Sequence, residues 1–257
     1  MGITASLNNE STPSMQLALA RPAPLLLAAL LLLCAELSRA AVTAQQCGPV
    51  WGTRHWGPFD YRRPVAGAGG VGIVENAHFT PWVEAGLGGK TGPIGGDLNY
   101  TLRAFPNHHR ALVTMSKVTR RENKDRLPGM EWPVECYFER ALRFAKDDVL
   151  VYMLYAQWLG ERKRAGEARI LLDSALPLAG ENPQTHYNIG LIYFELGDHE
   201  AARRQALKAK DMGWPLTTLA DQLKAAGHWP VADGAAAQPA ASAPVGPLPA
   251  SAPARPG

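Results

Sequence analysis

Two adjacent histidines near the middle of the chain raise the question of chemistry. Residues 104–112 read AFPNHHRAL, so that His108 and His109 precede an arginine. Imidazoles bind transition metals and transfer protons near neutral pH. Ligand pairs on a helix lie three or four residues apart, because neighbouring side chains point about 100° apart. No ligand stands at those spacings here, so the pair predicts the first turn of a helix in which His108 packs inward.

Distant partners leave an enzyme or a small-ligand binder as an alternative. Its pocket would lie between the segment 45–98, rich in glycine and aromatic residues, and the helix that begins near His108. The candidate residues are His78, Asp97, His108 and His109. No nucleophile–base pair and no metal-ligand spacing stands out in the sequence. We therefore predict a protein without catalytic residues, cofactor or metal.

Two glycine motifs resemble nucleotide-binding loops. Residues 67–72 read GAGGVG and match G-x-G-x-x-G. A dinucleotide site needs a strand before this motif and a helix after it. Pro64 precedes it and Pro81 soon follows, which leaves room for no helix of useful length. Residues 88–91, GGKT, end like a phosphate loop, but Glu84 occupies the position of its first glycine. Both motifs predict turns.

The N-terminal residues 1–44 resemble an export leader. Arg21 precedes an unbroken apolar run over residues 25–35, and small residues end at two candidate cleavage points, Ala40 and Ala44. This pattern is typical of a cleaved signal peptide. An uncleaved anchor is the alternative, although the run is shorter than the roughly 20 residues that span a bilayer. Bulky Leu33 argues against lipoprotein processing at Cys34. The expected location is the periplasm or envelope.

Charge and the other end of the chain limit the possible partners. The formal net charge of the 257 residues is only +3, which does not predict nucleic-acid binding. Residues 231–257 consist mostly of Ala, Pro, Ser and Gly. Such a composition buries too little apolar surface to offset the entropy of ordering, so we expect a disordered tail.

The cysteines predict one disulfide. Cys34 leaves with the signal peptide, so Cys47 and Cys136 remain as an even pair in a chain bound for an oxidising compartment. A bridge over a loop of this length stabilises by about 4–5 kcal/mol in the chain-entropy model. It would attach the N-terminal segment to the helical body. The alternative is two unrelated thiols.

A repeat of 34 residues organises the second half of the chain. Residues 182–215 predict two amphipathic helices joined by a turn at residues 197–198, and a shift of 34 residues finds matching apolar or small residues. The paired positions are Tyr155 and Ile189, Ala156 and Gly190, Ala168 and Ala202, Leu172 and Ala206, and Ala175 and Ala209. Another step back predicts a helix over VECYFERALRFAKDD, residues 134–148, whose partner helix is displaced upstream to the histidine stretch by about ten extra residues.

This pattern resembles the tetratricopeptide repeat family, and the whole mature chain is similar to a group of uncharacterised exported bacterial tetratricopeptide proteins. The resemblance implies a mainly α, short helical-hairpin solenoid. An irregular segment packed on the repeats is expected over residues 45–98, followed by a divergent first repeat over 99–147 and two clear repeats over 148–182 and 183–215. A capping helix is expected over residues 216–230. Its apolar face would consist of Leu216, Leu219, Leu223 and Ala226, and Gly227 would be its C-cap. Aromatic residues of the first segment would pack over the first repeat, with a ligand surface as the alternative.

The resemblance also implies a concave groove that receives a peptide or a helix. The residues expected to line it are Leu150, Met153, Gln157, Glu161, Tyr187, Asn188, Leu191, Phe194 and Glu195. The basic residues of the family's carboxylate clamp are missing from the aligned positions. The alternative is that Tyr187 and Phe194 only pack against neighbouring helices. We expect an exported protein-interaction module that binds a protein or peptide, with a purely structural, self-associating protein as a further alternative.

Overall fold

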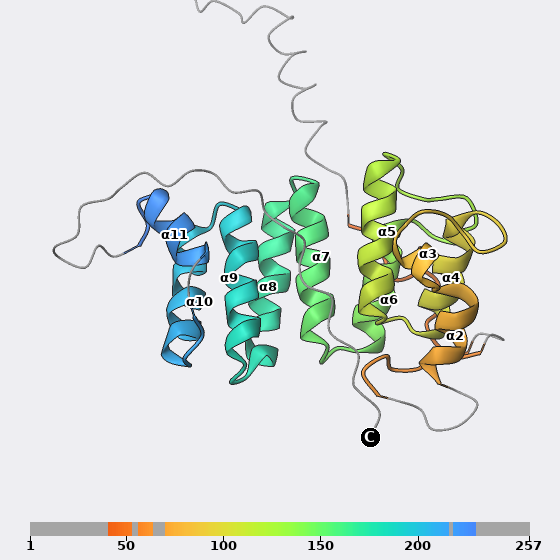
Figure 1. Ribbon diagram of the computed structural model, residues 1–257, viewed down its shortest axis with the longest axis horizontal. Helices are drawn as coiled ribbons and strands as arrows, with labels where there is room; N and C mark the ends of the chain where they lie inside the picture. The colour runs from red at the N-terminus through yellow and green to blue at the C-terminus, as the bar shows by residue number, and fades with distance from the viewer. Residues whose placement is uncertain (1–40, 53–55, 64–69, 216–217, 230–257) are drawn as a thin grey trace, which may run out of the picture. The chain divides into compact units, whose positions relative to one another are not determined.

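Helices are the only regular secondary structure in the described part of the chain, which contains no strand and so confirms the mainly α prediction. The computed structural model describes residues 41–52, 56–63, 70–215 and 218–229. Every described helix lies in the part of the chain that begins at Val42 (Figure 1). The helices are α2 (Val71–His78), α3 (Pro81–Glu84), α4 (Ile94–Ala104), α5 (His109–Arg121), α6 (Val134–Phe144), α7 (Val149–Glu161), α8 (Ala165–Ala179), α9 (Pro183–Glu195), α10 (His199–Asp211) and α11 (Thr218–Ala225).

The predicted signal peptide and the predicted tail lie outside the described residues, apart from Ala41 to Ala44 at the end of the leader. In the part that the structure describes, every helix is too short or too polar to cross a bilayer.

Consecutive helices pair into hairpins, and the hairpins stack in chain order. α5 contacts α6, α7 contacts α8, and α9 contacts α10. The first helices of successive hairpins also contact each other, from α5 to α7, α7 to α9 and α9 to α11, and each second helix contacts the helix that follows it. These contacts place α5, α7, α9 and α11 in one layer and α6, α8 and α10 in another, as the green-to-blue part of Figure 1 shows.

The residues that match at a spacing of 34 form the interior of this stack. All ten are buried, and seven of them are alanine or glycine. Gly190 shows why small residues stand there: a Cβ atom at this position would lie 2.7 Å from Leu219 Cδ2 and 3.3 Å from the Ala202 carbonyl oxygen. Small residues therefore let the backbones of α9, α10 and α11 approach closely.

Short-range signals set the helix ends. The side chains of Asn182 and Asp198 accept hydrogen bonds from backbone amides three residues later, at 3.0 and 3.1 Å, and so cap the N-termini of α9 and α10. Gly197 and Gly227 have φ of +74° and +75°, the left-handed conformation that ends helices with glycine. Leu219 and Leu223 of α11 are buried, but Ala226 lies beyond the end of α11 and is exposed, contrary to the predicted apolar face.

The segment 45–98 is more helical than the sequence suggested. The expectation that no useful helix fits between the glycine motif and Pro81 is wrong, because α2 occupies eight residues there and α3 begins at Pro81 itself. α4 then starts within the segment and runs to Ala104. Val74 of α2 packs against Ala104 and Phe105, so contacts distant in sequence stabilise a helix that its own composition does not predict.

The long connection between α5 and α6 packs on α4. Leu127 and Met130 in this connection are buried in the main core. Gly129 has φ of +87°, and a Cβ atom there would lie 2.6 Å from the Gly96 amide nitrogen. The extra residues of the first hairpin are therefore part of the fold and cover the N-terminal turn of α4.

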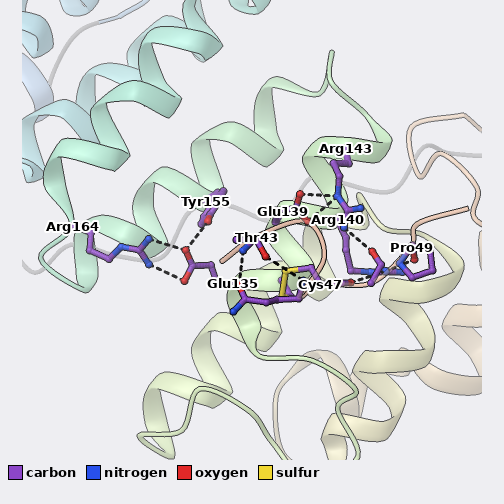
Figure 2. Close-up of a disulfide and its surroundings, with 12 residues drawn as sticks. Thr43, Cys47, Pro49, Glu135, Glu139, Arg140, Arg143, Tyr155 and Arg164 are labelled. Carbon is purple, nitrogen blue, oxygen red and sulfur yellow. Dashed lines mark hydrogen bonds and ion pairs between the residues drawn. A yellow bond between two sulfur atoms is a disulfide. The ribbon is translucent and has the colours of Figure 1, made fainter. Parts of the chain in front are cut away.

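The predicted disulfide is confirmed. Cys47 and Cys136 are both buried and bonded, with 4.9 Å between their Cα atoms (Figure 2). Arg140, one turn further along α6, donates hydrogen bonds to the carbonyl oxygens of Cys47 and Pro49 at 3.2 and 2.5 Å. The guanidinium also lies 4.0 Å from the Trp132 ring. The bridge and the arginine together attach the N-terminal segment to α6.

Aromatic residues of that segment pack in two ways. Trp56 and Phe59 form edge-to-face and tilted contacts with each other and with Phe105. Trp51 tilts against Phe144 of α6, with ring centroids 6.2 Å apart, although it is 54% exposed. Trp82 is 56% exposed. The remaining two, Tyr61 and Phe79, contact His108 and belong to the polar cluster described below.

Candidate functional site

A shallow cavity lies between α7 and α9, on the layer formed by the first helices of the hairpins. Its volume is about 170 Å³. Of the nine residues predicted to line a groove, Gln157, Glu161 and Glu195 line it. The other walls are Gly160, Ile192 and Leu196. The cavity therefore has an apolar floor and a rim with one amide and two carboxylates.

Close packing of the two helices shapes this cavity. A Cβ atom on Gly160 would lie 2.7 Å from Leu196 Cδ2, so the glycine lets the end of α9 approach α7. Ile192 is buried and belongs to the main core. The sequence pattern did not predict Ile192 and Leu196 as walls, because it assigned only outward-facing positions of α9 to the groove.

The two carboxylates of the rim have different surroundings. Glu161 pairs with Arg120 of α5. Glu195 has no cation within ion-pair distance among the described residues, and its side chain is exposed at the rim. Partial desolvation and the neighbouring Glu161 carboxylate both raise the pKa of Glu195.

The other predicted groove residues divide between surface and core. Leu150 is 40% exposed near the start of α7, whereas Met153 is buried at 5% and cannot present its side chain to a partner. The Tyr187 hydroxyl accepts a hydrogen bond from the Leu219 amide at 3.4 Å, which favours the packing alternative for this residue. Three further members of the set, all half-buried on α9, are Asn188, Leu191 and Phe194.

His108 is a buried cap and not a free imidazole. Its Nδ1 accepts a hydrogen bond from the Ala111 amide at 3.2 Å, which identifies it as the N-cap of α5. Nε2 then carries the proton and donates to Glu75 Oε1 at 3.1 Å. The ring stacks on Tyr61 with centroids 4.0 Å apart and meets Phe79 edge-on. The prediction that His108 packs inward is confirmed, although it precedes the first helical residue.

Burial and hydrogen bonding shift the pKa values in this part of the structure. Desolvation lowers the pKa of His108 below its usual value, against the opposing effect of Glu75. The hydrogen bond from His108 lowers the pKa of Glu75. The pair is therefore a neutral imidazole beside a carboxylate. Arg110 donates to the same carboxylate at 3.1 Å and pairs with Glu84, which ties α2, α3 and α5 together.

His109 belongs to a second polar network at the start of α7, where Asp148 is the N-cap. Its Nε2 lies 2.8 Å from Oδ2 of Asp148, a buried carboxylate that also accepts from Asn107 Nδ2 at 2.8 Å. Asn107 donates to Asp60 as well, at 2.7 Å. Arg62 binds Asp60 and Asp147, and its hydrogen bond is the main cause that lowers the pKa of Asp60. This network connects the loop at residues 58–63 to the start of α7.

The remaining candidates of the enzyme alternative form a third pair. His78 Nδ1 donates to Asp97 Oδ1 at 2.9 Å, and the Lys90 amide donates to Asp97 Oδ2 at 2.7 Å. Three histidines thus have three different carboxylate partners. Within the described ranges, no group of three or more His, Cys, Asp or Glu residues could hold a metal ion. The arrangement orients side chains and joins helices.

A buried ion pair between hairpins was not predicted at all. Glu135 of α6 accepts from the Tyr155 hydroxyl at 3.0 Å and from Arg164 at 2.8 Å (Figure 2). Desolvation and the carboxylate raise the pKa of Tyr155. The sequence signal was a glutamate within the apolar run 134–138, because a charge in such a run needs a partner.

Comparison with known proteins adds no assignment: no family model, curated protein or solved structure matches this chain.

Proposed function

We propose that this protein is a non-enzymatic protein-interaction module built as a short tetratricopeptide-like array. Three features support this proposal. The 34-residue pattern resembles the tetratricopeptide repeat, the residues of this pattern are buried in stacked hairpins, and the first helices of successive hairpins contact each other. In such an array each hairpin buries its apolar face against its neighbours, and the exposed layer is free to bind.

Export to a bacterial envelope is part of the same proposal. The leader pattern in residues 1–44 supports it. The disulfide between Cys47 and Cys136 is a second argument, since such bonds persist in oxidising compartments and are rare in the cytosol.

One observation carries the choice of surface. The cavity between α7 and α9 contains three of the residues that the repeat pattern assigned to a groove, from two successive hairpins: Gln157, Glu161 and Glu195. The partner would therefore lie across the layer of α5, α7 and α9, and would contact more than one repeat.

Photo-crosslinking in the producing cells tests the proposal. A photoreactive phenylalanine analogue would replace Gln157 on α7 or, as a matched control, Ser174, an exposed residue of α8. We expect one stoichiometric crosslinked protein from the Gln157 position and none from the Ser174 position. Equal crosslinking at both positions, or none at Gln157 in a folded and exported protein, would refute the choice of surface.

A further inference from the structure

The cavity between α7 and α9 has an electrostatic feature that its packing does not require. The exposed carboxylate of Glu161 pairs with Arg120 of the neighbouring helix. The Glu195 carboxylate is exposed at the rim, and no described Lys, Arg or His lies within 4.0 Å of it. Partial desolvation and the like charge of Glu161 disfavour its ionised form, and a cation placed beside it would favour that form.

The neighbouring basic residues are engaged elsewhere. Arg169 of α8 donates to the Leu196 carbonyl oxygen at 3.1 Å and lies 3.3 Å from Asp198. Arg162 stacks on the Trp158 ring at 3.8 Å. The rim of the cavity thus keeps an excess of negative charge next to the apolar side chains of Ile192 and Leu196.

The size of the cavity limits what can occupy it. Pockets for small organic ligands measure roughly 300–1,000 Å³. A cavity of about 170 Å³ is smaller than that, and it matches a single long side chain. Lysine and arginine have an apolar stem and a charged tip, so the stem can lie on an apolar floor while the tip reaches a carboxylate.

We propose that this cavity receives a lysine or arginine side chain of a partner protein, with its stem against Ile192 and Leu196 and its cation hydrogen-bonded to Glu195 and the Gln157 side-chain oxygen. The inference rests on the proposed function, because it names the chemistry of the partner at the same layer of helices. An acidic or purely apolar anchor would leave Glu195 unpaired and desolvated.

A randomised twelve-residue peptide library displayed on phage is the probe. It would be selected against the purified, disulfide-bonded protein and, in parallel, against Glu195→Gln and the control Glu181→Gln, which removes the same charge from an exposed residue that lines no part of the cavity. The best peptide would then be titrated with its basic residue intact or replaced by methionine. Methyl resonances of Ile192 and Leu196 report whether the peptide occupies the cavity.

We expect enriched peptides to share one lysine or arginine and to bind the wild type and Glu181→Gln equally. Glu195→Gln and the methionine peptide should each weaken binding at least tenfold, and the two changes together should weaken it no further than either one, since a charge-assisted hydrogen bond is shared between them.

Three outcomes would overturn the inference. The first is that the enriched peptides share no lysine or arginine. The second is that Glu195→Gln binds the best peptide as tightly as the wild type, and the third is that the peptide binds without shifting the methyl resonances of Ile192 and Leu196. Failure here with crosslinking intact at Gln157 would leave the interaction module standing and reject only the cationic anchor. Failure of both experiments would reject the module itself.

Discussion

Replacing His108 tests whether this buried histidine is a helix cap and packing residue, as its contacts indicate. His108→Phe keeps an aromatic ring between Tyr61 and Phe79 but removes the acceptor for the Ala111 amide. Loss of an N-cap costs about 1 kcal/mol. Glu75 also loses a donor, although Arg110 still binds it, so the total loss in the free energy of unfolding should be about 1–2 kcal/mol.

Truncation should cost considerably more. His108→Ala removes the cap and the ring together, and deletion of a fully buried aromatic ring costs about 3–5 kcal/mol. We therefore expect His108→Ala to lose about 4 kcal/mol or more, which is a large part of the stability of an ordinary domain.

The same contacts predict how stability depends on pH. Nδ1 of His108 accepts a hydrogen bond and cannot take a proton without losing it, and burial lowers the pKa of the ring. As pH falls below about 6.5, the unfolded chain therefore binds a proton that the folded protein does not, and the free energy of unfolding decreases. One such group contributes at most about 1.4 kcal/mol per pH unit. His108→Phe lacks this contribution.

Urea unfolding between pH 5.5 and 7.5 measures both effects. The difference in stability between the wild type and His108→Phe should shrink as pH falls, while His228→Gln, at an exposed histidine, should follow the wild type. A difference that is constant with pH would refute the capping argument. A loss below about 1 kcal/mol for His108→Ala would refute the packing argument and return attention to a catalytic or ligand-binding role.

Three further predictions concern the fold. Reducing the disulfide should lower the free energy of unfolding by about 4–5 kcal/mol. Urea unfolding with and without reductant measures this change. An unchanged urea midpoint would contradict the role of the disulfide as a constraint on the unfolded chain. Gly190→Ala should lower the free energy of unfolding by about 1–3 kcal/mol, because the added Cβ atom meets Leu219. Gly166→Ala, on the open surface of α8, should raise it by about 0.5–1 kcal/mol. Equal melting temperatures of the two variants would contradict the close approach of the helices at Gly190. Glu135→Ala should cost about 1–3 kcal/mol, because the Tyr155 hydroxyl loses its buried acceptor while Arg164 keeps its pair with Glu167. Tyr155→Phe in the Glu135→Ala background should recover part of that loss in the same unfolding assay.

Local and periodic signals predicted much of the helical stack. Small and apolar residues at a fixed spacing of 34 must lie on the same faces of successive hairpins, so their burial follows from helix geometry. The pairing of Cys47 with Cys136 followed from their even number and from the expected compartment. Neither inference needed to know which helices meet across the stack.

The candidate site was only partly accessible to the same reasoning. Gln157, Glu161 and Glu195 were all assigned to one groove from the repeat pattern, and they line the same cavity. Met153 and Tyr187 were grouped with them, but Met153 is buried and the Tyr187 hydroxyl bonds the Leu219 amide, because each helix of this layer also packs against the next one.

The helical class, the 34-residue spacing of buried positions and the disulfide could be predicted from the sequence, because these depend on periodicity and composition along one chain. Tertiary structure alone decided that α2 forms, that three histidines have three different carboxylate partners, and that Glu195 lacks a cation beside it. These features arise from contacts between residues far apart in sequence, and the cost or benefit of a charge depends on what burial places around it.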